Sequence, residues 1–263
     1  MKFSSANQLE WAKTYDIPNI IVPSYEVTVL PIPTSEGGFI ATGTLSSQNV
    51  FVAKLDNQGE IVWIKKFGSD KIYGLEIFED GSFFVSGQVH SFDHGLSRLL
   101  DHRLSKLDAN GNILWSKIYG DNGWNGTALV RKDTDGGVIL SGWTGTFGLD
   151  TDLSLVKLDQ DGNLLWRRVY ARPNNTNIMW FDAQRVTPLP NGGYLCSGYV
   201  TNGNLGLTDI LVMKISNSGT LEWSKVYGSN QSDFGVEALV VNDGYIIRGV
   251  YKETANSDDK SLY

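Results

Sequence analysis

The sequence has little of what would assign it to several common classes of protein. Its single cysteine, Cys196, cannot form a disulfide within the chain, so the fold does not depend on an oxidising compartment. Lysine and arginine number 22 against 29 aspartate and glutamate residues, which gives a formal net charge of −7. No basic cluster occurs, and nucleic-acid binding is therefore not expected.

Long apolar runs are also missing. No stretch of about 18 apolar residues is present, so we expect no transmembrane segment. Residues 1–9 lack the basic start and apolar core of a secretory signal. The chain should therefore be soluble, and its location stays open between the cytoplasm and export without a visible leader.

Familiar catalytic and cofactor motifs are absent too. There is no nucleophile elbow, phosphate-binding glycine loop or zinc-binding cysteine set. The histidines His90, His94 and His102 fall in one long insertion, and a spacing of four would suit a metal only on a helix, which the sequence between them does not predict. We expect no metal site, no cofactor and no assignable catalytic residue.

What the chain does contain is an internal repeat. Five segments, LEWAKTY, IVWIKKF, ILWSKIY, LLWRRVY and LEWSKVY, place a tryptophan in one context, at Trp11, Trp63, Trp115, Trp166 and Trp223. Four are preceded by a turn, DNQG, DANG, DQDG or SNSG. Apolar runs on both sides of a glycine-bearing turn predict a β-hairpin. The Asp-Gly pairs resemble calcium loops only superficially, because no twelve-residue ligand pattern follows.

The rest of each unit repeats as well. Turns before residues 39, 82, 138, 194 and 245 introduce short apolar strands, each of which reaches a glycine, and another apolar stretch precedes each turn. Each period of about fifty residues therefore holds four strands, which is the size of a propeller blade. We predict an all-β, five-bladed β-propeller of four-stranded antiparallel blades, forming one domain over residues 1–263.

The two ends of the sequence predict how the ring closes. The segment SLY joined to MKFSSANQLEWAKTY resembles ILVMKISNSGTLEWSKVY of residues 210–227. We therefore expect the N-terminal residues to complete the last blade, which removes the exposed sheet edges of an open stack.

The consensus K-L-D-x-x-G-x-φ-φ-W-x-K-φ-Y-G, with a preceding D-G-G-φ-φ-φ-S-G, resembles bacterial β-propeller repeat proteins. Many of these are secreted or surface-attached, and they are functionally unassigned. The resemblance covers essentially the whole chain and is strongest over residues 135–170. It implies a scaffold and no particular activity.

Candidate site residues come from the strand that we expect to be innermost, between the tryptophan strand and the following turn. Near its start the repeat supplies the aromatic residues Tyr25, Tyr73, Trp124, Trp180 and Phe234. A few residues later come Thr28, Glu76, Thr127, Asp182 and Glu237. In equivalent registers these would form an aromatic circle around three carboxylates at one channel mouth, and Trp124, Trp180 and Phe234 with Asp182 and Glu237 are the first choice.

Three functional interpretations follow. The favoured one is a non-catalytic binding or interaction module for a glycan or protein partner, since aromatic rings stack on sugars and acids orient hydrogen bonds. The alternatives are a structural component of a larger assembly and a glycoside hydrolase that uses Glu76, Asp182 and Glu237. The protein would act as a monomer or as one component, and longer connections at residues 16–26 and 171–184 are candidate partner contacts.

Overall fold

A computed structural model describes residues 2–3, 5–13, 30–46, 49–67, 71–91, 99–120, 124–145, 151–170, 181–201, 208–251 and 261–262. These residues form β-strands and turns and contain no helix. In particular, none of them belongs to a helix that could cross a membrane.

Four sheets have four strands each, and we call them blades 1 to 4. Blade 1 contains β3 (Leu30–Pro33), β4 (Phe39–Ser46), β5 (Asn49–Leu55) and β6 (Ile61–Phe67). Blade 2 contains β7 (Lys71–Ile77), β8 (Phe83–Ser91), β9 (Leu99–Leu107) and β10 (Ile113–Tyr119). Blade 3 contains β11 (Trp124–Lys132), β12 (Val138–Gly145), β13 (Thr151–Leu158) and β14 (Leu164–Tyr170). Blade 4 contains β15 (Phe181–Pro188), β16 (Tyr194–Thr201), β17 (Thr208–Ile215) and β18 (Leu221–Tyr227).

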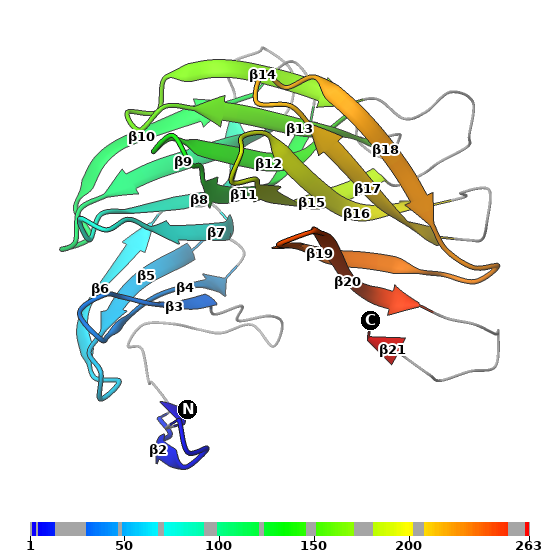
Figure 1. The fold of residues 1–263 in the computed structure, drawn as a ribbon. Helices are drawn as coiled ribbons and strands as arrows, with labels where there is room; N and C mark the ends of the chain where they lie inside the picture. The colour runs from blue at the N-terminus through cyan, green and yellow to red at the C-terminus, as the bar shows by residue number, and fades with distance from the viewer. Residues whose placement is uncertain are drawn as a thin grey trace.

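Each blade is an antiparallel meander whose strands pair in chain order. The blades lie side by side around a common axis, as in a β-propeller (Figure 1). Contacts between successive blades run through β3, β7, β11 and β15, and these first strands line the centre. The expected all-β propeller of four-stranded antiparallel blades is confirmed at this level, including the choice of the innermost strand.

Hydrogen bonds from backbone N–H groups hold the aspartate of the D-x-x-G turns in place. In blade 2, the Asp108 carboxylate accepts hydrogen bonds from the backbone N–H groups of Asn110 at 2.9 Å and Asn112 at 2.8 Å. Asp159 makes the same pair of bonds in blade 3. These backbone donors, chiefly that of Asn163, lower the pKa of the Asp159 carboxyl. The aspartate of the repeat is therefore a turn-forming residue.

The repeat tryptophans Trp63, Trp115 and Trp166 each lie over the turn of the next blade. Trp115 of blade 2 covers Gly162 of blade 3, and Trp166 of blade 3 covers the turn of blade 4, where its indole N–H donates to the Asn217 carbonyl at 3.1 Å. Tyr119 donates to the Gly162 carbonyl at 2.7 Å. The repeated aromatic pair thus fastens each blade to its successor.

Gly162 is required by this contact as well as by its backbone. Its φ is +72°, and a Cβ atom there would lie 2.5 Å from the Trp115 ring. Replacing Gly162 with alanine is expected to lower the free energy of unfolding by about 3 kcal/mol, from left-handed backbone strain and displacement of the indole. Urea denaturation would measure this. Gly136, with φ +84° and open space at its Cβ position, is the matched control.

The Gly136→Ala variant retains only the backbone strain and should lose about 1–2 kcal/mol. Equal losses in the two variants would show that the tryptophan contact contributes nothing.

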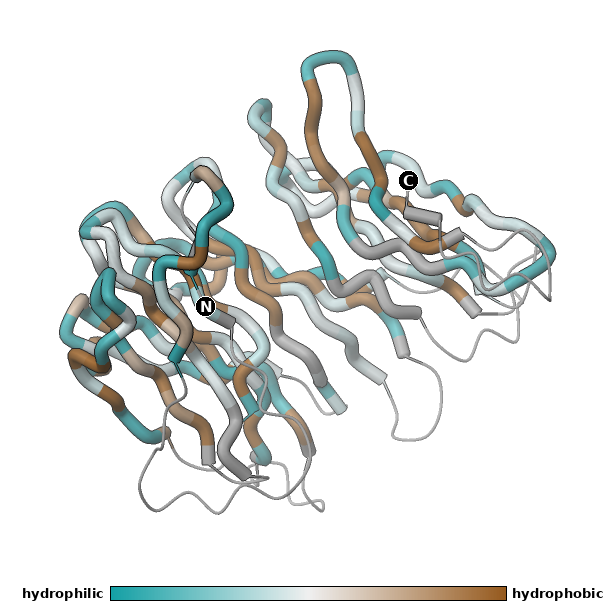
Figure 2. The backbone as a smooth tube through the Cα atoms, turned by 90° about the horizontal axis from the view of Figure 1, so that it is seen from below, coloured by the Kyte–Doolittle hydropathy of each residue, from teal (hydrophilic) through white to brown (hydrophobic). Residues whose placement is uncertain are grey.

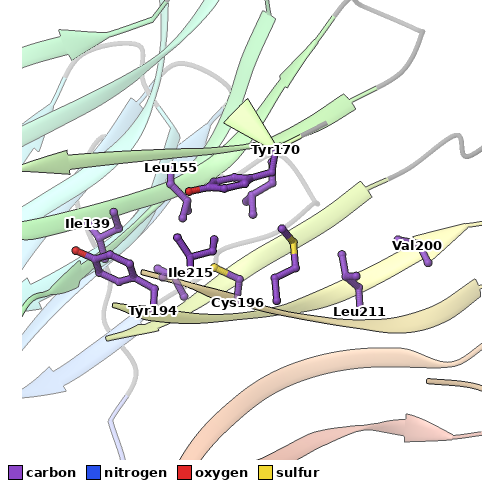
Figure 3. Close-up of a cluster of buried hydrophobic side chains, with 11 residues drawn as sticks. Ile139, Leu155, Tyr170, Tyr194, Cys196, Val200, Leu211 and Ile215 are labelled. Carbon is purple, nitrogen blue, oxygen red and sulfur yellow. The ribbon is translucent and has the colours of Figure 1, made fainter. Parts of the chain in front are cut away.

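The core lies between the blades. At the interface of blades 3 and 4, Tyr170, Tyr194, Cys196 and Met213 are buried in one apolar cluster, part of which Figure 3 shows. Burial raises the pKa of the Cys196 thiol to about 12, so this thiol is unreactive at neutral pH. Along the backbone, hydrophilic residues gather at the hairpin turns and hydrophobic ones within the strands (Figure 2).

One charged network is buried between blades 3 and 4. The Lys157 ammonium lies 2.7 Å from Asp133 and 2.6 Å from Asp135. The side chains of Lys157 and Asp133 are only 2% and 3% exposed, and Tyr194 donates to the same Asp133 carboxylate at 2.6 Å. Burial alone would raise the pKa of Asp133, but the hydrogen bonds from Lys157 and Tyr194 lower it.

Two smaller sheets complete the described structure. One contains β19 (Phe234–Val241), β20 (Gly244–Tyr251) and β21 (Ser261–Leu262), and the other is a hairpin of β1 (Lys2–Phe3) and β2 (Leu9–Trp11). The hairpin lies against blade 1, where Trp11 covers Gly59 and donates to the Asn57 carbonyl at 3.0 Å. Figure 1 shows β2 and β21 apart.

Candidate functional site

The innermost strands β7, β11, β15 and β19 begin at one end of the channel, and most of the predicted site residues lie on them. Tyr25, Thr28 and Trp180 lie outside the described residues. Tyr73 is half-buried, donates a hydrogen bond to Gln88 Oε1 at 2.9 Å, and has a phenol pKa raised by burial. Trp124 opposes Gly145, and Phe234 opposes Val250.

The strand register shows that these residues do not form one layer. The glycine that ends each second-strand motif gives a common reference: Gly87, Gly142, Gly198 or Gly249. The position of each acidic residue is given relative to the glycine of its own blade. Asp182 opposes the residue just after that glycine, Glu237 opposes the residue just before it, and Glu76 opposes the third residue before it. At roughly 3.3 Å per residue, Asp182 and Glu76 differ by about 13 Å along the channel.

The reason for this difference is that the aromatic residues themselves begin at different depths. Trp124 opposes the third residue after the reference glycine of its blade, Phe234 opposes the first residue after its own, and Tyr73 lies within the β-bulge of β7. Each of the four innermost strands has a bulge that adds one residue. A fixed sequence distance from the aromatic residue therefore ends at different depths. Glu237 lies between the other two acidic residues, two residues in depth from each.

Glu76 reaches from β7 to the next blade, where Arg131 of β11 lies 3.2 Å from its carboxylate. The Glu76 side chain is 22% exposed. Its pKa is raised above the ordinary value for a glutamate, because desolvation outweighs the opposing charge and hydrogen bond of Arg131. A carboxyl group that keeps its proton at higher pH is suited to donate it.

This pairing predicts a pH-dependent stability. Because the folded-state pKa of Glu76 is raised, its contribution favours folding below the unfolded pKa and is lost as pH rises through the folded pKa. Arg131→Gln should therefore lower the free energy of unfolding by about 1 kcal/mol at pH 7 and by less at pH 4. Urea titrations at the two pH values measure this, and a loss that is equal at both would contradict it. In an Arg131→Gln, Glu76→Gln double variant the pH difference should disappear.

Glu237 belongs to a second ion pair, which interrupts the repeat. It lies 3.1 Å from Arg248, the cross-strand neighbour on β20. The other blades place small hydroxyl residues at the position of Arg248, and these are fully buried: Thr42, Ser86, Ser141 and Ser197. Arg248 is visible in the sequence as R-G where the repeat has S-G or T-G, but only the register connects it to Glu237.

The described residues contain no group of three or more histidine, cysteine, aspartate or glutamate side chains placed to hold a metal ion. The Glu76 and Glu237 carboxylates instead each have an arginine beside them. The chemistry available at these positions is that of carboxyl groups with guanidinium partners.

No family model and no curated protein matches the sequence. Among solved structures, the subtype N10 neuraminidase-like protein of A/little yellow-shouldered bat/Guatemala is similar at a TM-score of 0.53 and 14% identity, over 87% of this chain and 77% of that one. The Dos1 propeller gives 0.48 and 14%, over 81% and 50%. The endo-arabinase from Bacteroides thetaiotaomicron gives 0.47 and 14%, over 95% and 96%.

These comparisons support the propeller fold and correct the favoured function. A non-catalytic binding or interaction module was the first expectation from the sequence, and it is corrected here, because the protein that is similar at a TM-score of 0.53 is neuraminidase-like. The glycoside hydrolase alternative agrees better with this likeness. At such low identity the likeness itself establishes the fold alone.

Proposed function

We propose that this protein is a glycoside hydrolase of the propeller type, with Glu76 as general acid and Glu237 as its carboxylate partner. The observation that carries this proposal is the pair of glutamates on innermost strands, each fixed by its own arginine, of which Glu76 has a raised pKa. Hydrolysis of a glycosidic bond requires one carboxyl group that donates a proton and one that acts as a nucleophile or base.

The architecture in this proposal is a single domain over residues 1–263 with five blades. The β19–β21 sheet would be the inner part of the fifth blade, and the β1–β2 hairpin its outer part. Lys2 opposes Trp11 in the hairpin, as Lys214 opposes Trp223 in blade 4, which supports this assignment. In β20–β21, however, Val250 opposes Leu262, a register one residue away from the alignment of the two sequence ends.

The strand register is compatible with this choice of carboxyl groups. Glu76 and Glu237 differ by two residues in depth, roughly 7 Å along the strands, and the separation of β7 from β19 across the centre adds to this offset. Glycosidases hold their two carboxyl groups about 5 to 10 Å apart. The larger difference in depth between Glu76 and Asp182 favours a role for Asp182 in binding or orienting the sugar.

The aromatic residues would provide the sugar platform. Tyr25, Tyr73, Trp124, Trp180 and Phe234 remain proposed ligand contacts, since aromatic rings stack on the apolar faces of sugar rings. Arg131 and Arg248 would orient the two glutamates.

The test is hydrolysis by the purified protein. Fluorogenic glycosides of sialic acid, arabinofuranose and xylose are suitable substrates, because the similar structures include a neuraminidase-like protein and an endo-arabinase. Release of the fluorophore that disappears in a Glu237→Gln variant is the expected result. Absence of hydrolysis of these glycosides and of arabinan and xylan by the folded wild-type protein would refute the proposal.

A further inference from the structure

Arg185 is an exception to the repeat on the innermost strand of blade 4. It opposes Ser197, the residue just before the reference glycine of that blade. At the equivalent position the other innermost strands have Leu30, Gly74, Leu129 and Glu237. Arg185 and Glu237 are therefore the two charged residues that the innermost strands carry at this depth. They lie on strands that follow one another around the centre, β15 and β19 (Figure 1).

The side chain of Arg185 lies on the face of β15 that is turned toward β19. Successive side chains of a strand point to opposite faces, so Arg185 and Thr187 share one face and Val186 lies on the other. Val186 is buried in the core cluster between blades 3 and 4. The Thr187 hydroxyl donates a hydrogen bond to the Ala238 carbonyl of β19 at 3.0 Å, which gives the direction of the shared face. Because Ala238 directly follows Glu237, Arg185 faces the strand that holds this glutamate.

The charge of Arg185 is not compensated in the way that the charges of Arg131 and Arg248 are. Arg131 lies 3.2 Å from the Glu76 carboxylate, and Arg248 lies 3.1 Å from that of Glu237. Arg185 is exposed, and its guanidinium has no ion-pair partner among the side chains that the structure describes. One guanidinium is therefore available to an anion that enters the channel, although the whole chain has a formal net charge of −7.

The depth of Arg185 relates it to both proposed catalytic groups. Along the strands it lies at the level of Glu237 and two residues, roughly 7 Å, from the level of Glu76. A sugar held between the two glutamates would therefore have the guanidinium beside it. A guanidinium binds a carboxylate through two parallel hydrogen bonds, which adds geometric specificity to the attraction between the charges. The anion that fits this position is a carboxylate attached to the sugar ring.

We infer that Arg185 binds the carboxylate of an acidic sugar and thereby makes carboxylate-bearing glycosides the preferred substrates. This inference rests on the proposed function and adds to it the class of substrate. A neutral sugar at the same place would lack this contact and would bind more weakly.

Equilibrium binding tests the inference separately from catalysis. The probes are methyl thioglycosides of glucuronic, galacturonic and sialic acid, whose sulfur bridge resists hydrolysis. Each is used as the free acid and as its methyl ester, which removes the negative charge and keeps the ring. Isothermal titration calorimetry on the wild-type protein at pH 7 should show at least one free acid that binds about tenfold or more tightly than its ester, as expected for a hydrogen-bonded pair of charges.

Substitutions at Arg185 then show whether this residue causes the preference. Arg185→Gln should abolish it and leave the affinity for the methyl ester unchanged. Arg185→Lys keeps the charge but loses the paired donors, so it should retain part of the preference. The matched control is Arg168→Gln, which replaces an exposed arginine on the outer strand β14 and should bind like the wild type. Added salt should weaken the binding of the free acid only.

No measurable binding, equal affinities for acid and ester in all three pairs, or a preference that survives Arg185→Gln would overturn the inference. Hydrolysis of acidic and neutral O-glycosides, measured in parallel, keeps the two proposals apart. Hydrolysis without a preference for the acid would refute the role of Arg185 alone. A preference that depends on Arg185, without any hydrolysis, would refute the proposed function alone.

Discussion

Replacing Glu76 with glutamine is expected to lower kcat for glycoside hydrolysis by about 10²–10⁴-fold, the usual contribution of a general acid. Glutamine preserves the size of the side chain and its hydrogen bond to Arg131 but has no proton to donate. The largest loss should occur with substrates that have poor leaving groups, such as arabinan, because these depend most on protonation of the departing oxygen. Steady-state kinetics on a glycan and on an aryl glycoside with a good leaving group would measure both losses.

Glu79→Gln is the control for this measurement. Glu79 lies three residues after Glu76, and its side chain is 98% exposed. Its carboxylate pairs weakly with Lys132, at a distance of 3.8 Å from Oε1 to Nζ. Its replacement should leave kcat unchanged. The raised pKa of Glu76 gives a second readout, because wild-type activity should fall as pH rises through that pKa, and Glu76→Gln should lack this step. If Glu76→Gln retained full activity on both substrates, another residue would have to be the acid.

The second large effect is one of stability. Lys157→Met is expected to lower the free energy of unfolding by about 3–5 kcal/mol, since it leaves the buried Asp133 carboxylate without its cation. Methionine keeps the unbranched stem and removes the ammonium group that lies 2.7 Å from Asp133. Urea denaturation monitored by tryptophan fluorescence would measure the loss.

The repeat itself provides the control for Lys157. Lys54 holds the same position in blade 1, but there it is 20% exposed and pairs with Glu36, which is 73% exposed. Lys54→Met should cost less than about 1 kcal/mol, as is usual for surface ion pairs. Equal losses at the two positions would show that burial of the Lys157 network is not what makes it important.

The network of Lys157 and Asp133 is expected to make the free energy of unfolding decrease at acid pH. The pKa of Asp133 is lowered in the folded state, so its contribution is present above the unfolded pKa of about 4 and is lost as pH falls through the lower, folded value. Wild-type stability should therefore decrease below about pH 4. In Lys157→Met this part of the decrease should shrink, because the partner that lowers the Asp133 pKa is gone.

Much of the fold could be predicted because the same pattern of turns and apolar strands occurs five times in the sequence. The hairpins around Trp63, Trp115, Trp166 and Trp223 and the choice of innermost strand follow from the order of turns and apolar runs. The partial exposure of these tryptophans was less predictable. The rings of Trp63, Trp115 and Trp166 pack on the turn of the following blade, and the sequence of one repeat does not show which residues its neighbour places there.

The site was predicted less well than the fold, for a physical reason. Residues of the innermost strands were aligned by their distance from an aromatic residue, but these aromatic residues begin at different depths: Trp124 opposes the third residue after the reference glycine of its blade, and Phe234 opposes the first. Glu76, Asp182 and Glu237 therefore reach different depths. Arg131 and Arg248 were missed because ion pairs between neighbouring strands depend on register.

The placement of each tryptophan over the next turn has a consequence for how the molecule comes apart. A blade that loses contact with the following blade leaves its own tryptophan exposed. Loss of one interface therefore destabilises the neighbouring interface, as in a repeat protein whose stability depends on nearest-neighbour contacts. Amide hydrogen exchange should accordingly be slow and nearly uniform through blades 2 and 3, which have partners on both sides. It should be fastest in β19 and β20, whose faces are open, and unfolding should begin there.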